Sequence, residues 1–212
     1  MKELLINAIK NENNSKLPDS GQKRALDLTG YRTRNILNNV CSGEKINYLE
    51  VGLYRGGTFS AALYNNKINA VGIDNWSQNW GPDSAKMEFF YRLNEVQEEN
   101  EVKIIQSDCW SVDLKEITNF LNGEKINVYF FDGPHDYKDQ YDALKYYIDI
   151  LSDEFILFVD DYSSIKSPLV VKGTQDSIVE LGLTKIFDIE LPAGVDGNAY
   201  HEGLYAAALR KK

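Results

Sequence analysis

Short apolar runs alternate with longer segments of helical spacing from residue 46 onwards. The runs have the length of buried strands, and the segments between them are long enough for crossover helices. This alternation predicts repeated strand–helix–strand units, and therefore a parallel sheet with helices on both faces. The expected strands span residues 46–51, 70–73, 102–105, 126–131 and 155–159, and the expected helices span 57–65, 83–98, 113–121 and 136–151.

The last fifty residues break this alternation. One more helix is expected over about 170–182, and two strand-like runs follow at 184–191 and 203–209. The turn-rich segment 192–198 joins the two runs. A connection as short as this one joins antiparallel strands, so the sheet should end in a hairpin.

The first forty residues have a different character. A short amphipathic segment leads into a polar run, and Ser20 is placed to cap a helix over about 22–40 with Gly30 as its weak point. We therefore expect an N-terminal helical arm or cap over residues 1–40 and one α/β domain over 41–212. The total of 212 residues suits one hydrophobic core of that size.

Composition excludes several classes of protein. With 43% hydrophobic and 26% charged residues the chain is typical of ordinary globular proteins. The net charge is −9, and the longest basic cluster is Arg210, Lys211 and Lys212. Because nucleic-acid binding needs a basic surface that neutralises phosphates, we expect no nucleic-acid partner.

Cysteine content and the N-terminus point to the cytoplasm. Cys41 and Cys109 are too few for a disulfide framework and have no metal-ligand spacing, so both should be free thiols. Residues 1–10 lack the pattern of an export signal, and no stretch approaches 18 apolar residues. We expect a cytoplasmic protein with no membrane partner.

Acidic residues stand at the end of every expected parallel strand. Because parallel strands end at one edge of the sheet, where ligands bind in open α/β sheets, these carboxylates should gather at one rim. A single such residue is more often a helix cap, but five strand ends in register favour a site. The residues are Glu50, Asp74, Asp108, Asp132 and the pair Asp160 and Asp161.

The first strand is followed by a glycine-rich turn. Gly52, Gly56 and Gly57 allow the backbone to turn tightly and to approach a ligand. The spacing is neither that of a dinucleotide fingerprint nor that of a P-loop. Asp74 follows about 22 residues after Gly52, where a carboxylate can accept hydrogen bonds from both hydroxyls of a ribose.

Five motifs together resemble a known family. They are Glu50-x-Gly52-x-x-x-Gly56-Gly57-Thr58, Asp74, Ser107-Asp108-Cys109, Phe131-Asp132-Gly133-Pro134-His135-x-Tyr137 and Val159-Asp160-Asp161-Tyr162. The combination is similar to that of the class I S-adenosylmethionine-dependent methyltransferases. Within that class it is most similar to the small-molecule O-methyltransferases that include the macrocin-type sugar enzymes. The resemblance runs from about residue 46 to residue 210.

This resemblance implies a Rossmann-like, doubly wound sheet of seven strands in the order 3-2-1-4-5-7-6, with the last strand antiparallel. It implies S-adenosylmethionine as the cofactor and a small-molecule hydroxyl, in a sugar or a phenol, as the methyl acceptor. Carried over by position, the cofactor site would hold the methionine moiety beside Glu50 and Gly52, with Gly56 in the same turn. The ribose would bind Asp74. The adenine amino group would bind Asp108, and the adenine ring would lie against Cys109 or Trp110.

Asp132, Asp160 and Asp161 should converge at the ends of two adjacent strands. Three carboxylates without a counter-charge repel one another, and a divalent cation relieves that repulsion. All-oxygen ligation favours Mg²⁺ or Ca²⁺ over Zn²⁺. Several metal-assisted O-methyltransferases hold Mg²⁺ at this place, so the resemblance implies Mg²⁺ bound by these three residues.

His135 is the better of two histidines for a general base. It follows the candidate catalytic residue Asp132 by three positions, and the ordinary imidazole pKa suits proton abstraction at neutral pH. Pro134 stands where macrocin-type enzymes have a second Asp, which puts more weight on His135. Tyr162 replaces the Asn that follows the paired Asp in catechol-type enzymes, so the chain departs from the metal motif there.

Two other functions fit parts of the sequence. Tyr141 and Lys145 form the Y-x-x-x-K pattern of short-chain NAD(P)-dependent oxidoreductases, although the serine expected about 13 residues earlier is Val128. The other alternative is a domain that binds the cofactor without turnover. Such a domain needs none of the four residues Asp132, His135, Asp160 and Asp161. The sequence leaves the acceptor open between a sugar hydroxyl, a phenol and a small polyketide, and leaves open whether the chain forms a homo-oligomer.

Overall fold

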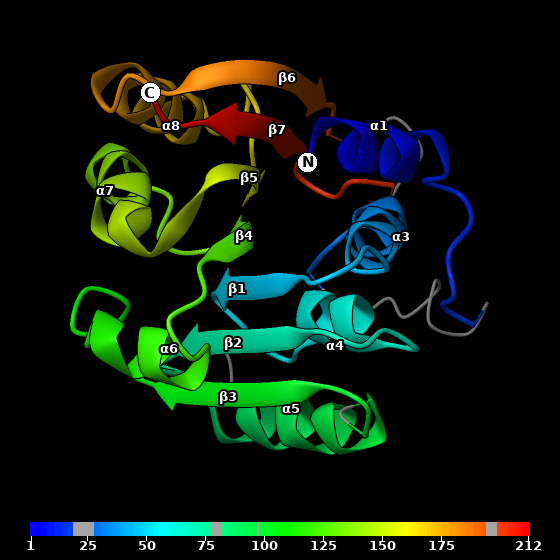
Figure 1. Ribbon diagram of the computed structural model, residues 1–212. Coiled ribbons are helices and arrows are strands. Elements are labelled where there is room, and N and C mark those ends of the chain that lie inside the picture. Colours follow the sequence, from blue (N-terminus) through cyan, green and yellow to red (C-terminus); the bar gives the residue numbers. More distant parts are fainter. Residues whose placement is uncertain (19–27, 78–81, 97, 194–198) are drawn as a thin grey trace.

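The computed structural model describes residues 1–18, 28–77, 82–96, 98–193 and 199–212. Its centre is a seven-stranded sheet in the order β3-β2-β1-β4-β5-β7-β6, as the resemblance implies (Figure 1). The pairs among β1 to β5 are parallel, and β7 is antiparallel to both of its neighbours. The strands are β1 Asn47–Val51, β2 Asn69–Asp74, β3 Glu101–Gln106, β4 Ile126–Phe131, β5 Leu151–Asp160, β6 Thr184–Leu191 and β7 Leu204–Arg210.

Helices cover both faces of this sheet. One face packs against α1 Lys2–Lys10, α3 Tyr31–Val40, α4 Gly57–Leu63 and α5 Pro82–Val96, and the other packs against α6 Leu114–Phe120, α7 Tyr137–Tyr147 and α8 Pro168–Glu180. Side chains of β1 alternate between the two cores, with Tyr48 in the first and Leu49 in the second. Because both faces are covered, every residue of β1 is buried, which explains why the parallel strands appear as continuous apolar runs.

Among the described residues, the single helix expected over 22–40 does not extend back through Gly30. Ser20 and residues 22–27 lie outside the described residues, so the predicted cap stays a prediction. Gly30 has extended backbone angles, and α3 starts at Tyr31. A Cβ at Gly30 would lie 2.1 Å from the carbonyl oxygen of Ala199, so a close approach of two backbones sets the start of α3.

The helix expected over 136–151 ends earlier than predicted. It stops at Tyr147, a short 3-10 helix covers Ile148–Ile150, and β5 begins at Leu151. Leu151, the last residue of the expected helix, pairs in register with Ile126 of β4. Further along the same strand, Glu154 pairs with Arg210, and their side chains form an ion pair of 3.1 Å. Tertiary pairing therefore overrides the local helical pattern at this point.

The N-terminal arm packs directly on the body of the domain. Leu5 of α1 and Leu37 of α3 are fully buried in the same core as the sheet. The side chain of Asn38 donates a 2.7 Å hydrogen bond to the backbone carbonyl of Ala61, and that of Lys16 donates one of 2.9 Å to the carbonyl of Asn65. The arm is thus held by polar contacts as well as by its apolar face, while the division at residue 40 stays a prediction.

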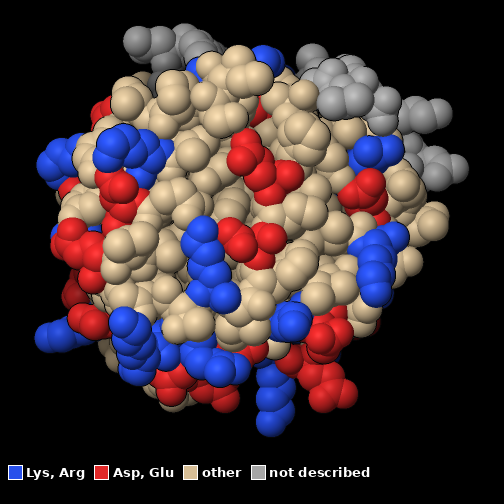
Figure 2. Space-filling view, turned by 90° about the horizontal axis from the view of Figure 1, so that it is seen from above, with Lys and Arg blue, Asp and Glu red and all other residues tan. Residues whose placement is uncertain are grey.

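Charged groups of both signs are mixed on the face seen in Figure 2. Acidic side chains lie in its centre and between the basic side chains of its rim, which agrees with the net charge of −9. Within the described ranges, no helix has both the length and the apolar character that a membrane span requires.

Candidate functional site

A cavity of about 470 Å³ opens at the carboxyl ends of the central strands. Its volume and its place in the sheet are those of small-molecule sites in doubly wound folds. Most of the predicted site residues line it, namely Gly52, Asp74, Asp108, Cys109, Asp132, His135 and Asp161. The other three, Glu50, Gly56 and Asp160, lie behind its wall.

The turn after β1 forms the floor of the cavity. Gly52 has φ +90°, and a Cβ there would lie 1.9 Å from the carbonyl oxygen of Asp132. Only glycine therefore allows the ends of β1 and β4 to come this close. Gly56 also has positive φ and directly precedes α4, and a Cβ on it would meet the ring of Phe89.

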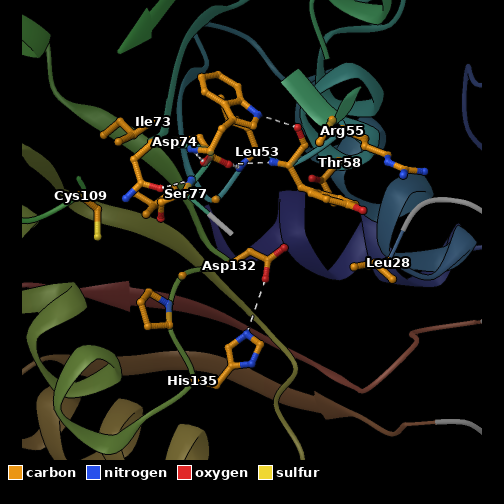
Figure 3. A pocket seen from close by; sticks show the side chains of 18 of the residues that line it. Leu28, Leu53, Arg55, Thr58, Ile73, Asp74, Ser77, Cys109, Asp132 and His135 are labelled. Carbon is orange, nitrogen blue, oxygen red and sulfur yellow. Dashed lines mark hydrogen bonds and ion pairs between the residues drawn. The ribbon is translucent and has the colours of Figure 1, made fainter. Parts of the chain in front are cut away.

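Asp74 holds the same turn from the end of β2. Its Oδ2 accepts hydrogen bonds from the backbone N–H groups of Leu53 (2.7 Å) and Tyr54 (2.8 Å), and its Oδ1 accepts one from Trp76 (2.6 Å). Figure 3 shows Asp74 beside Leu53 at the edge of the cavity. A carboxylate offers about four acceptor directions, so one remains for a ligand hydroxyl.

Glu50 is fully buried under this turn. Thr58, whose side chain faces the cavity, donates a 2.6 Å hydrogen bond to Oε1, and the Tyr48 hydroxyl donates to Oε2. Burial raises the pKa of Glu50 to about 8, although the two hydrogen bonds act in the opposite direction. The structure thus places Glu50 where it supports Thr58 rather than at the cavity surface.

The loop after β3 supplies the next part of the wall. The Oδ1 of Asp108 accepts a hydrogen bond of 2.8 Å from the backbone of Trp110. The Trp110 ring packs edge-on against Tyr146, with ring centroids 5.7 Å apart. Cys109 is half-buried beside it, and burial raises the pKa of its thiol to about 12, so the thiol stays protonated at neutral pH.

Asp132, His135 and Asp161 form a compact cluster on the other side of the cavity. The Nε2 of His135 lies 3.1 Å from Oδ2 of Asp161 and 3.9 Å from Oδ1 of Asp132. Figure 3 shows Asp132 and His135 turned toward each other. One ligand atom from each of the three residues lies within 4.8 Å of the other two, a spacing that suits a divalent cation.

Charge interactions within this cluster are strong. Its contact with Asp132 raises the pKa of His135, and so does the charge of Asp161, whereas partial burial lowers it. Asp160 is 2% exposed, and its Oδ1 accepts no hydrogen bond from the described residues. Burial first, and then the charges of Asp132 and Asp161, raise the pKa of Asp160 well above its usual value.

Several residues that line the cavity carry no motif. Tyr54 and Trp76 have positive φ, and the Trp76 indole donates a 2.9 Å hydrogen bond to the carbonyl of Tyr54. Leu28, His201 and Glu202 also line the cavity. For Leu28, His201 and Glu202 the sequence offers no signal beyond His201 being one of two histidines, because long-range packing brings these three residues to the site.

The Y-x-x-x-K pair lies elsewhere. Tyr141 and Lys145 are on α7, where the lysine forms an ion pair of 2.6 Å with Glu180. Neither residue contributes to the lining of the main cavity. The arrangement therefore gives no support to the oxidoreductase alternative.

Comparison with known proteins gives a consistent result. The family described as a methyltransferase domain matches residues 49–162. No curated protein matches the chain.

Solved structures share the fold at low identity. One is the O-methyltransferase TomG from Streptomyces achromogenes in complex with S-adenosylmethionine, which is 16% identical with a TM-score of 0.54, covering 98% of this chain and 90% of that chain. An O-methyltransferase from Bacillus cereus in complex with S-adenosylhomocysteine is 12% identical with a TM-score of 0.53, covering 98% and 91%. The TDP-rhamnose 3′-O-methyltransferase CalS11 is 16% identical with a TM-score of 0.53, covering 99% and 93%.

Proposed function

The chain belongs to the class I S-adenosylmethionine-dependent methyltransferases, whose domain matches residues 49–162, and we propose that it methylates a hydroxyl oxygen of a small molecule. The observation that carries this proposal is one cavity that joins the glycine turn at Gly52 to the cluster of Asp132, His135 and Asp161. Such a cavity can hold a methyl donor and a proton acceptor side by side. The three similar solved structures are of O-methyltransferases, which is consistent with this reaction.

The cofactor would occupy the half of the cavity that we call the cofactor side, lined by Gly52, Asp74, Asp108 and Cys109. The remaining acceptor direction of Asp74 is available to a ribose hydroxyl, and Asp108 to the adenine amino group. Gly52 leaves room for the methionine moiety, and the buried Glu50 would fix the Thr58 side chain beside it by accepting the hydrogen bond of the Thr58 hydroxyl. These roles follow from the positions of the residues and from the family resemblance.

The acceptor hydroxyl would lie next to His135. In the reaction its oxygen forms a bond to the methyl carbon while the carbon–sulfur bond breaks, and the hydroxyl proton moves to the imidazole of His135. Asp161, 3.1 Å away, and Asp132 stabilise the imidazolium that results. General-base assistance of this kind is typically worth ~10²–10⁴-fold in rate.

A divalent cation fits the same place. We propose Mg²⁺ held by Asp132 and Asp161, whose carboxylates belong to this cluster, because Oδ1 of Asp161 is buried and accepts no hydrogen bond from the described residues. Asp160, which the sequence predicts as the third ligand, lies behind the cavity wall and is not one of the clustered groups. When bound, the ion would lower the pKa of the acceptor hydroxyl. The negative charges of Asp132 and Asp161 would offset the positive charge of the ion.

Binding and turnover measurements test this proposal. Calorimetry should show S-adenosylhomocysteine binding and no NADH binding, and methyl transfer should be detected with 3,4-dihydroxybenzoate or TDP-rhamnose as the acceptor. A chelator should lower that rate by about 10²-fold, with Mg²⁺ restoring it, since metal assistance is worth several kcal/mol. NADH binding without S-adenosylhomocysteine binding contradicts the proposal, cofactor binding without turnover supports the non-catalytic alternative, and turnover unchanged by the chelator removes the metal.

A further inference from the structure

The start of α3 and the loop before β7 touch through their backbones. A Cβ at Gly30 would lie within 2.6 Å of three backbone atoms of Ala199 and Tyr200. The backbone N–H of Arg32 donates a 2.9 Å hydrogen bond to the carbonyl of Ala199. Ala199 and Tyr200 are 3% and 5% exposed, so this is a packed junction and not a surface contact.

Three side chains tie the N-terminal arm to this junction. The Tyr200 hydroxyl donates a hydrogen bond to Glu12, and the guanidinium of Arg32 lies 3.5 Å from the same carboxylate. Arg32 also lies over the Tyr200 ring, 5.8 Å from its centroid. We call Glu12, Arg32 and Tyr200 the latch. The latch joins three segments of the chain that are not adjacent in sequence.

The latch adjoins the cavity directly. Leu28 and Thr29 line the cavity just before Gly30, and His201 and Glu202 line it just after Tyr200. Figure 3 shows Leu28 across the cavity from Cys109, on the far side from the adenine end of the site. We call these four residues the acceptor side.

The chemistry of the acceptor side differs from that of the cofactor side. Leu28 offers an apolar contact, whereas His201 and Glu202 offer hydrogen-bond donors and acceptors. Glu202 is held by an ion pair of 2.9 Å with Lys166, and His201 lines the same cavity as Asp161. This surface suits a small molecule with an apolar body and a second polar group.

We propose that the latch positions the acceptor side, and that Leu28, Thr29, His201 and Glu202 select the methyl acceptor. This inference rests on the proposed function and extends it, because it assigns acceptor recognition to contacts between the arm and the loop before β7. Glu12, Arg32 and Tyr200 are positioning residues: they do not line the cavity, and they act through their neighbours in sequence.

Replacement of Tyr200 by Phe is the sharpest test. It keeps the ring under Arg32 and removes only the hydroxyl that reaches Glu12. The matched control is Tyr205→Phe, because the Tyr205 hydroxyl also donates to a carboxylate, that of Asp188 at 3.0 Å, and Tyr205 does not line the cavity.

Three readouts are compared in both variants. Amide hydrogen exchange at residues 29–32 and 200–203, measured by NMR, should accelerate about tenfold in Tyr200→Phe and stay at the wild-type rate in Tyr205→Phe. The Kd for S-adenosylhomocysteine should stay within twofold of wild type in both. With the acceptor that the wild type methylates, Tyr200→Phe should raise KM about tenfold and leave kcat within twofold.

The outcomes separate the two proposals. Unchanged exchange at these residues in Tyr200→Phe overturns the latch, and so does a loss of S-adenosylhomocysteine affinity equal to the rise in KM. If the wild type binds no S-adenosylhomocysteine, the proposed function fails, while the exchange measurement still decides whether the latch holds the cavity wall. A rise in KM with unchanged cofactor affinity supports both.

Discussion

The two sides of the cavity are held together by different kinds of contact. On the cofactor side, the carboxylate of Asp74 fixes the turn after β1 by accepting backbone hydrogen bonds from Leu53 and Tyr54, which are 21 and 20 positions away. On the acceptor side, the latch joins Tyr200 to Glu12, which are 188 positions apart. One side is a local backbone turn, and the other is an assembly of distant side chains.

This difference has consequences for recognition. A turn fixed by backbone groups tolerates few substitutions, so it suits a ligand that stays the same, such as the cofactor. A wall made of side chains from the arm and from a loop can change without disturbing the sheet, so it suits an acceptor that differs between relatives. The cluster of Asp132, His135 and Asp161 lines the same cavity as both sides, and in the proposed reaction it lies next to the methyl group that is transferred.

Replacement of His135 by Gln has the largest expected effect on this arrangement. Glutamine has a similar length and polarity but cannot take up the acceptor proton. We expect kcat to fall by ~10²–10⁴-fold, with the Kd for S-adenosylhomocysteine within twofold of wild type. Steady-state kinetics and calorimetry on the same preparation measure both quantities.

The control for that experiment is the other histidine. His201 lines the acceptor side, so His201→Gln should raise KM and leave kcat nearly unchanged. If both variants lost kcat equally, the distinction between a base at His135 and recognition at His201 would be lost. If His135→Gln kept the wild-type kcat, the metal alone would promote deprotonation of the acceptor hydroxyl, and His135 would serve only to shape the turn after β4.

The contrast between local and long-range contacts also explains what the sequence predicts. The strand order followed from the family resemblance. Most of the cavity lining followed from residues at strand ends, such as Asp74 and Asp132, because each sits in its own strand's pattern. The end of α7 and the start of α3 were misplaced, because Leu151 pairs with Ile126 of β4 and Gly30 packs on Ala199. No local pattern encodes partners that far away.

The same reasoning applies to individual site residues. The sequence identified Asp74 as a candidate ligand, but nothing in it indicated that the carboxylate already accepts three backbone hydrogen bonds. Leu28 and Glu202 reach the cavity only through the junction at Ala199. Roles that depend on side-chain orientation, such as that of the buried Glu50, required coordinates.

Replacement of Asp74 by Ala has the second-largest expected effect, and it tests the cofactor side. The change removes both the remaining acceptor direction and the hydrogen bonds that shape the turn. Hydrogen bonds to charged groups are worth about 1.5–3 kcal/mol, so the Kd for S-adenosylhomocysteine should rise about 10- to 100-fold. Isothermal titration calorimetry measures this directly.

A matched aspartate away from the cavity controls for lost stability. Asp113 caps α6 by accepting a 3.0 Å hydrogen bond from the backbone of Lys115, and it does not line the cavity. Asp113→Ala should therefore lower stability and keep cofactor affinity. Unchanged affinity in Asp74→Ala would mean that the cofactor side does not depend on Asp74, contrary to its assigned role.

The smallest expected effect concerns Glu50 and the pH dependence of folding. The pKa of Glu50 is about 8 in the folded chain, against 4.5 for an ordinary glutamate. Between these values the folded state holds a proton that the unfolded state has lost, so the free energy of unfolding falls as pH rises. One pKa unit corresponds to about 1.36 kcal/mol, so the loss between pH 6 and pH 8 should be about 2 kcal/mol.

Glu50→Gln removes this titration and keeps the hydrogen-bonding shape of the protonated carboxyl beside Tyr48 and Thr58. The free energy of unfolding of the wild type, measured by urea denaturation, should therefore fall by about 2 kcal/mol relative to that of the variant between pH 6 and pH 8. Parallel pH profiles for the two proteins would show that Glu50 is ionised in the fold. The turn after β1 would then pack on an ionised Glu50 carboxylate, and not on the neutral carboxyl that its raised pKa indicates.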